Sequence, residues 1–208
     1  MESIRNRAKD CFPMVLLTLL SIVQALALEL LWDHLNGRPD LHEASWNALV
    51  GWMQIAASLT GIILIWLTYS GMVLRVRWTP STADSVMPFF IGLVEFLMVD
   101  TMGPDKLGQW LIVLAIIFAT MIFVSHRIMR RARADSSNDE FFERYSPATK
   151  RDFMPQTVVI SAMIVSGGWL WMSGYNIWMS LLALLGTLAV LGHETRNSAR
   201  FWMLSMGE

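Results

Sequence analysis

The sequence predicts an all-α integral membrane protein with six transmembrane helices and both termini in the cytoplasm. Of the 208 residues, 54% are hydrophobic and only 16% are charged, with a mean hydropathy of +0.45. This composition lies outside the usual range of soluble globular domains. Six apolar stretches alternate with polar connections, and this alternation places all 16 Lys and Arg residues outside the spans, with only Arg38 and Lys106 on the outer side. That asymmetry is typical of a polytopic protein with its basic side inward, here predicted as one membrane domain over residues 1–208.

The predicted first span, residues 12–32, is an apolar run about as long as a bilayer requires. Thr18, Ser21, Gln24 and Glu29 interrupt the run at intervals of three, three and five residues, and we place them on one side of a helix. Because a carboxylate in hydrocarbon is costly, this polar stripe is expected to face other helices or water. Glu29 is therefore predicted to be the most functionally sensitive residue in the membrane. The alternative is that Glu29 only extends to the outer water.

Basic residues precede this span, so a cleaved signal peptide ending near Ala25-Leu26-Ala27 is an alternative interpretation. We favour a retained helix because the apolar run continues to Trp32, beyond a typical signal core. The single cysteine, Cys11, allows no intrachain disulfide and no cysteine-based metal site. Residues 33–45 are rich in turn formers and are predicted to form the first outer connection.

The predicted second span covers residues 46–74. Largely small and polar residues recur along it at intervals of three and four: Gln54, Ser58, Gly61, Ile65 and Thr68. We expect this stripe to pack against the first helix, since small and polar side chains favour contacts between membrane helices.

The predicted third span, residues 86–101, is short and carries Gly92 and Glu95 three residues apart. This spacing places the carboxyl group close to a point where another backbone can approach. In the predicted topology Glu29 and Glu95 lie at similar depth in the outer half of the membrane. Two neighbouring carboxyl groups in a medium of low dielectric suit proton exchange or cation binding.

The predicted fourth span, residues 110–124, is the most uniformly apolar and contains only Thr120 as a polar residue. It is expected to face lipid. A basic cluster follows this span, and we expect it to contact lipid headgroups: Arg127, Arg130, Arg131 and Arg133.

Residues 132–155 form the longest polar segment and are predicted to be a cytoplasmic loop that is mobile or ordered by a partner. Partial helix is expected around residues 141–145. The fifth and sixth spans, residues 156–172 and 176–191, are joined by so short a link that they must form an antiparallel hairpin. Residues 193–208 are predicted to be a cytoplasmic tail.

Motifs for several kinds of chemistry are absent from the sequence. It contains no glycine-rich phosphate loop, no nucleophile elbow and no pair of histidines at metal-binding spacing, so we predict no cofactor, no metal and no catalytic residues. In number of spans the chain resembles voltage-gated cation channel subunits, but its fourth span lacks an arginine ladder and no selectivity filter precedes the sixth. The six-helix potassium channels of lysosomes and bacteria carry a Phe-Ser-Asp signature where this chain has Leu20-Ser21-Ile22. We assign the chain to neither family.

The leading functional hypothesis is a channel or transporter for an ion or small solute. The residues expected to line its path are Ser21, Gln24, Glu29, Gln54, Ser58 and Glu95. The alternative is a non-catalytic scaffold or accessory subunit that binds a cytoplasmic protein through residues 132–155, and an enzyme acting on lipid ranks third. Expected partners are the lipid bilayer, here a bacterial inner (plasma) membrane, and other copies of the chain in a homo-oligomer, but no nucleic acid.

Overall fold

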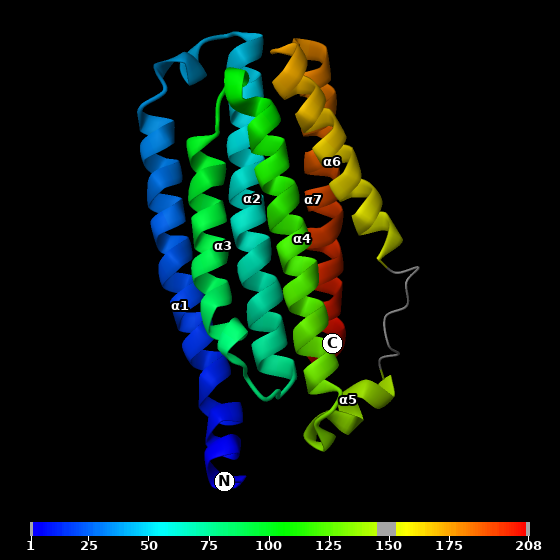
Figure 1. Ribbon diagram of the computed structural model, residues 1–208. Coiled ribbons are helices and arrows are strands. Elements are labelled where there is room, and N and C mark those ends of the chain that lie inside the picture. Colours follow the sequence, from blue (N-terminus) through cyan, green and yellow to red (C-terminus); the bar gives the residue numbers. More distant parts are fainter. Residues whose placement is uncertain (1, 145–152, 207–208) are drawn as a thin grey trace.

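The computed structural model describes residues 2–144 and 153–206 and contains only helices and their connections in those ranges (Figure 1). The long helices are α1 (Glu2–Asn36), α2 (Trp46–Arg75), α3 (Thr82–Asp100), α4 (Leu107–Ala132), α6 (Met154–Ser173) and α7 (Ile177–Met206). The connections hold the short helix α5 (Asp139–Arg144) and the 3₁₀ turns η1 (Pro39–His42), η2 (Pro104–Lys106) and η3 (Ser136–Asn138). Each of the six long helices is long and apolar enough to cross a membrane. The predicted all-α membrane fold is confirmed.

The long helices extend beyond the predicted spans at several ends. α1 begins before its apolar run, and α7 continues through most of the segment predicted as a polar tail. Leaving the hydrocarbon does not end a helix, because residues such as Ala, Arg and Glu continue it readily in water. Local capping fixes other ends: Ser45 Oγ accepts from Ala48 N at 3.1 Å, and Asp84 Oδ2 accepts from Ser81 N at 2.7 Å.

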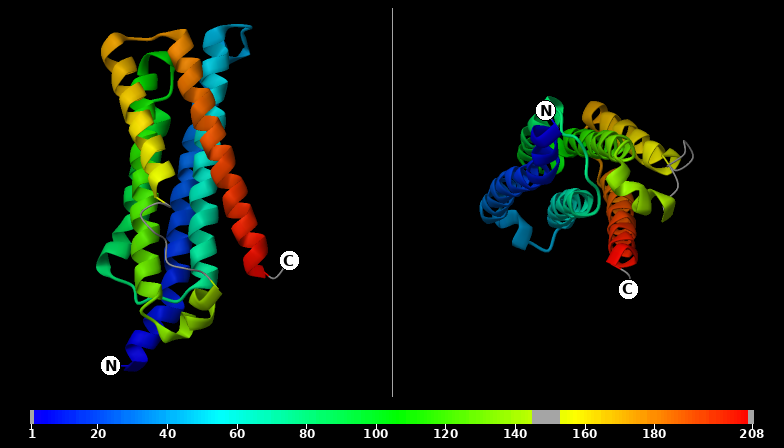
Figure 2. Two further views of the ribbon diagram at one scale, coloured as in Figure 1. Left: turned by 90° about the vertical axis from the view of Figure 1, so that its right-hand side faces the viewer. Right: turned by 90° about the horizontal axis from the view of Figure 1, so that it is seen from below.

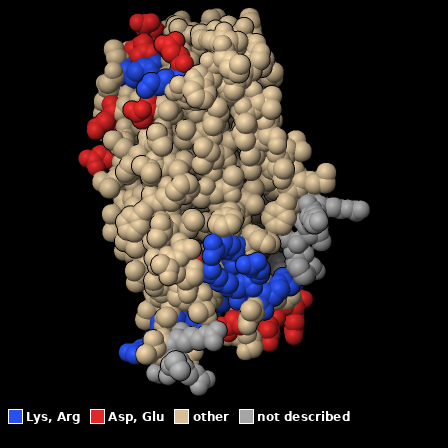
Figure 3. All heavy atoms as spheres, in the orientation of Figure 1, with Lys and Arg blue, Asp and Glu red and all other residues tan. Residues whose placement is uncertain are grey.

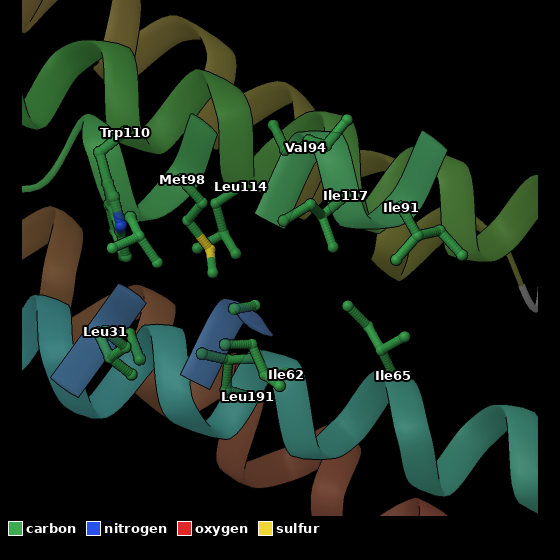
Figure 4. Packing of buried hydrophobic residues seen from close by; sticks show 14 of the residues in the cluster. Leu31, Ile62, Ile65, Ile91, Val94, Met98, Trp110, Leu114, Ile117 and Leu191 are labelled. Atoms are coloured by element: carbon green, nitrogen blue, oxygen red, sulfur yellow. The ribbon is translucent and has the colours of Figure 1, made fainter. Parts of the chain in front are cut away.

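α2 lies at the centre of the bundle and is the most buried helix. α1 packs mainly on α3, α2 on α7, and α4 on α6, so that α2 has neighbours on several sides (Figures 1 and 2). Ile65 of α2 points toward Ile91 of α3 and Ile117 of α4 (Figure 4). Both described ends of the chain lie toward the same end of the bundle (Figure 2). Assigning that end to the cytoplasm stays a prediction from the charge asymmetry.

The expectation that the fourth span is the main lipid-facing helix is wrong, because α1, α6 and α7 are all less buried than α4. Trp110, Leu111 and Leu114 of α4 are fully buried. The helix approaches α6 so closely that a Cβ added at Gly108 would lie 2.6 Å from the carbonyl oxygen of Gly167. A helix buried among other membrane helices is as apolar as one that faces lipid, so apolar content alone does not distinguish them. The glycines on the two sides of this contact, Gly108 and Gly167, indicate the helix interface instead.

α6 and α7 form the predicted antiparallel hairpin, with Gly174 at a φ of +83° in the link. The two helices then diverge, since α6 packs against α4 and α7 against α2 (Figure 2). Near the end that carries the termini, the space between them is bordered by α2 and α4.

Part of the predicted cytoplasmic loop is held against the bundle. Asn138 is buried, donates to the carbonyl oxygens of Arg77 and Ala132 at 2.7 Å each, and accepts from the Arg77 amide at 2.9 Å. Asp135 pairs with Lys9 at 2.5 Å. The expected helix around 141–145 is observed as α5, whereas residues 145–152 lie outside the described residues. The expected mobility of residues 132–155 therefore stays a prediction.

Candidate functional site

The buried face of α1 differs from the predicted polar stripe. Gln24 is the one polar residue in a row of buried positions at spacings of three and four: Leu16, Leu20, Gln24, Ala27 and Leu31. Glu29 is exposed on the outside of this chain. The five residue steps from Gln24 to Glu29 rotate the side-chain direction by about 140° beyond one full turn, so the two side chains point in different directions. Grouping them on one side was an error, and Glu29 does not face the other helices of this chain.

Gln24 instead contacts Glu95 in the interior of the bundle. Its Nε2 donates to Glu95 Oε1 at 3.1 Å and to the carbonyl oxygen of Ile62 at 2.9 Å. Gln24 is 4% exposed and Glu95 is fully buried. Among the described residues, the second carboxyl oxygen of Glu95 has no hydrogen-bond partner. This carboxyl group therefore holds one bonded and one unbonded oxygen where α1, α2 and α3 meet.

Gly92 permits this meeting of helices. It lies about one turn from Glu95 on α3, and a Cβ at Gly92 would overlap the side chain of Val23, the neighbour of Gln24. The absence of a side chain lets α1 and α3 approach closely enough for Gln24 to reach Glu95. The predicted close approach at Gly92 is confirmed.

The polar stripe of α2 faces a different neighbour from the one predicted. Gln54 Oε1 accepts from the amide of Gly103 at 3.1 Å, and Ser58 Oγ accepts from Trp110 Nε1 at 3.2 Å. Both α2 side chains are fully buried against α4 and the turn before it. The expectation that this stripe packs on α1 is wrong. A central helix has several neighbours, and the periodicity of its residues does not identify the helix that each of its faces contacts.

Contact between α1 and α2 runs through other groups. Besides the bond from Gln24 to Ile62, Trp66 Nε1 donates to Ser21 Oγ at 3.1 Å. Ser21 is half-buried, so of the predicted α1 path residues only Gln24 lies in the interior.

A further polar group lies toward the end that carries the termini. Tyr69 is fully buried, and its hydroxyl has no hydrogen-bond partner within the described part of the chain. It lines a small hollow together with Asp84. Asp84 is 5% exposed and pairs with Arg131 Nη1 at 2.5 Å. Sequence reasoning missed Tyr69, because a single tyrosine in an apolar span is usually a packing residue.

The four arginines of the basic cluster, which lie in the last turns of α4 and directly after it, have different surroundings. Arg131 forms the intramolecular pair with Asp84, whereas Arg130 is exposed. Arg127 lies 5.3 Å from the ring centre of Phe123, and Arg133 lies 4.4 Å from that of Phe142. Figure 3 shows basic side chains gathered toward the end with the N-terminus and a broad uncharged band across the middle of the molecule. Headgroup contact stays a prediction for Arg127, Arg130 and Arg133, but Arg131 is directed into the protein.

Buried polar groups thus recur along α2, at its contacts with α1, α3 and α4. Gln54, Ser58, Ile62 (through its carbonyl) and Tyr69 follow one another at spacings of four, four and seven residues. They cover about 22 Å of the helix axis, most of the roughly 30 Å of hydrocarbon in a bilayer. We call this set, with Gln24 and Glu95, the polar column.

Comparison with protein-family models, with curated protein sequences and with solved structures finds no match.

Proposed function

We propose that the protein is a transporter or channel for an ion or small solute, in which Glu95 binds and releases a proton. The observation that carries this proposal is the fully buried carboxyl group with one oxygen bonded to Gln24 and the other without a partner among the described residues. An ionised carboxylate near the centre of a spanning helix costs about 2.5 to 3.5 kcal/mol on insertion scales. An apolar side chain of similar size would pack at this point without that cost.

The polar column supports a path along α2 that passes Glu95. Gln54 and Ser58 lie on the side of Glu95 away from the termini, and Tyr69 lies on the side toward the termini. Between the levels of Glu95 and Tyr69, Ile65 and Ile91 are buried and point toward each other's helices (Figure 4). Passage through this apolar layer requires α1 and α3 to move relative to α2. α1 packs more extensively on α3 than on α2, which favours movement of α1 and α3 as a pair.

Proton flux into liposomes tests this proposal. Purified protein is reconstituted in vesicles that contain the pH-sensitive dye pyranine, and a potassium gradient with valinomycin drives proton uptake. Glu95→Gln keeps the size of the side chain and is expected to reduce the flux to that of protein-free vesicles. Glu29→Gln is the matched control, because Glu29 is exposed on α1 and is expected to leave the flux unchanged. Normal flux in Glu95→Gln and Glu95→Leu would contradict the proposal.

A second measurement follows protonation without knowledge of the transported solute. Infrared difference spectra between acid and alkaline pH should contain a carboxyl band that Glu95→Gln removes and Glu29→Gln retains. If the band is unchanged in Glu95→Gln, Glu95 does not exchange protons over that range and its proposed role is lost.

The second candidate function is a membrane scaffold that binds a cytoplasmic protein through residues 132–155. The exposed acidic residues of α5, namely Asp139, Glu140 and Glu143, favour it because they present charge beyond the membrane domain. Homo-oligomer formation is proposed with either function, since a neighbouring copy would shelter the exposed Glu29 from lipid. Unchanged flux after Glu95→Gln, together with lost partner capture after neutralising α5, would favour the scaffold.

A further inference from the structure

A cavity lies between α2, α4, α6 and α7, where α6 and α7 diverge. Its volume is about 460 Å³, within the range of about 300 to 1,000 Å³ typical of sites for small molecules. No residue of α1 or α3 lines it, so it is separate from the Gln24–Glu95 contact. The cavity is therefore a second candidate site, although Ile65 borders both the cavity and the apolar layer of the proposed path.

The walls of this cavity are apolar over most of its length. Its lining includes Leu64 and Ile65 of α2 and Leu114, Ile117 and Met121 of α4. The lining residues of α2 extend from Gly61 to Arg75, which corresponds to about 21 Å along the helix axis. A long apolar slot that runs from mid-membrane toward the end of the bundle has the shape and chemistry of a site for an acyl chain.

Polar groups line the end of the cavity nearest the termini, and both charge signs are represented. Arg75 is the last residue of α2, and its guanidinium lies 5.0 Å from the ring centre of Trp202. Glu194 of α7 is half-buried there. Gln156 of α6 also lines this end, and its Oε1 is buried without a hydrogen-bond partner among the described residues. The cavity therefore offers a cationic donor, a carboxylate and an unused amide acceptor beside its apolar slot.

We propose that this cavity binds one molecule of phosphatidylethanolamine from the leaflet that adjoins the basic end of the protein. One acyl chain fills the slot, and the phosphate accepts from Arg75. The primary ammonium donates to Glu194 and to Gln156 Oε1. Phosphatidylcholine has no N–H group to donate to Gln156, and phosphatidylglycerol has no cation to pair with Glu194. The charge pattern therefore selects the ethanolamine headgroup.

Photolabelling of the full chain in lipid nanodiscs tests the site. The probe is phosphatidylethanolamine with a diazirine near the end of one acyl chain, and labelled residues are located by mass spectrometry of peptides. Label is expected on partly exposed cavity residues such as Phe118 and Met121. Leu64→Trp, which projects into the cavity, should lower that labelling about five-fold. Ile63→Trp is the matched control, because Ile63 is 46% exposed and does not line the cavity.

The headgroup assignment has its own test in the unaltered protein. Unlabelled phosphatidylethanolamine should compete for the cavity label about five-fold better than phosphatidylglycerol or phosphatidylcholine. Glu194→Gln should abolish the preference over phosphatidylglycerol. Equal competition by all three lipids, or label spread over the exposed faces of α6 and α7 and unaffected by Leu64→Trp, would overturn the proposal.

Discussion

Replacement of Gly92 by alanine should separate α1 from α3. The added Cβ overlaps Val23, and a β-branched residue in a helix has little freedom to rotate away. Overpacking of this kind costs about 1 to 3 kcal/mol. Gly92→Ala also gains helix propensity of about 1 kcal/mol, so the clash is best measured against a glycine whose added Cβ meets no described atom.

Gly168→Ala provides that reference, because no atom of the described residues lies within 4 Å of a Cβ at Gly168. Both variants gain the same propensity, and their difference in free energy of unfolding isolates the clash. We expect Gly92→Ala to be about 1 to 3 kcal/mol less stable than Gly168→Ala. Reversible unfolding in mixed micelles, followed by circular dichroism, measures this difference.

Val23→Ala should rescue the variant, since it removes the group that the new Cβ overlaps. The double variant Val23→Ala/Gly92→Ala is expected to be more stable than the sum of the single effects predicts. Proton flux should fall in Gly92→Ala and recover in the double variant, because Gln24 can reach Glu95 only when the helices are close. If Gly92→Ala and Gly168→Ala unfold alike, the close approach of α1 and α3 is refuted.

Three further predictions concern the buried pair, the loop and the topology. Gln24→Leu removes the one hydrogen bond that the described residues make to the buried carboxyl group of Glu95. The free energy of unfolding in the same assay should fall by about 1 to 3 kcal/mol. A change near zero would show that the bond is dispensable. The Lys9 ammonium lowers the pKa of Asp135 from 3.8 to about 2, so this ion pair should hold the loop above pH 3.8 and release it as the pH falls through 2. Asp135→Asn should remove the ion pair at neutral pH and speed tryptic cleavage near Arg133. Unchanged cleavage in this variant would contradict the contact. Cysteines at Asn36 and Ser137 in a Cys11→Ser variant should react with impermeant reagents from opposite sides of the membrane, and labelling of both from outside would overturn the topology.

Several features could be read from the residues alone because they depend on local chemistry. Apolar length predicts each of the long helices, since backbone groups in lipid must bond within their own segment. The spacing of Gly92 and Glu95 predicts a close helix contact beside a carboxyl group, because a glycine without a side chain lets a neighbouring helix approach in any membrane protein. The short link before α7 predicts the hairpin, since three residues leave the chain no other direction.

The identity of the neighbours, in contrast, was decided only when the helices packed. Gln24 and Glu95 lie 71 residues apart in the chain, and no pattern in either span predicts their contact. α4 has a fully buried face although its composition suits lipid, and Glu29 is exposed although it is charged. In a bilayer, lipid and protein interiors are equally apolar, so hydrophobic periodicity does not separate the face that meets lipid from the face that meets another helix. Side-chain fit between distant segments makes that choice, and it placed the buried carboxyl group at Glu95 rather than at Glu29.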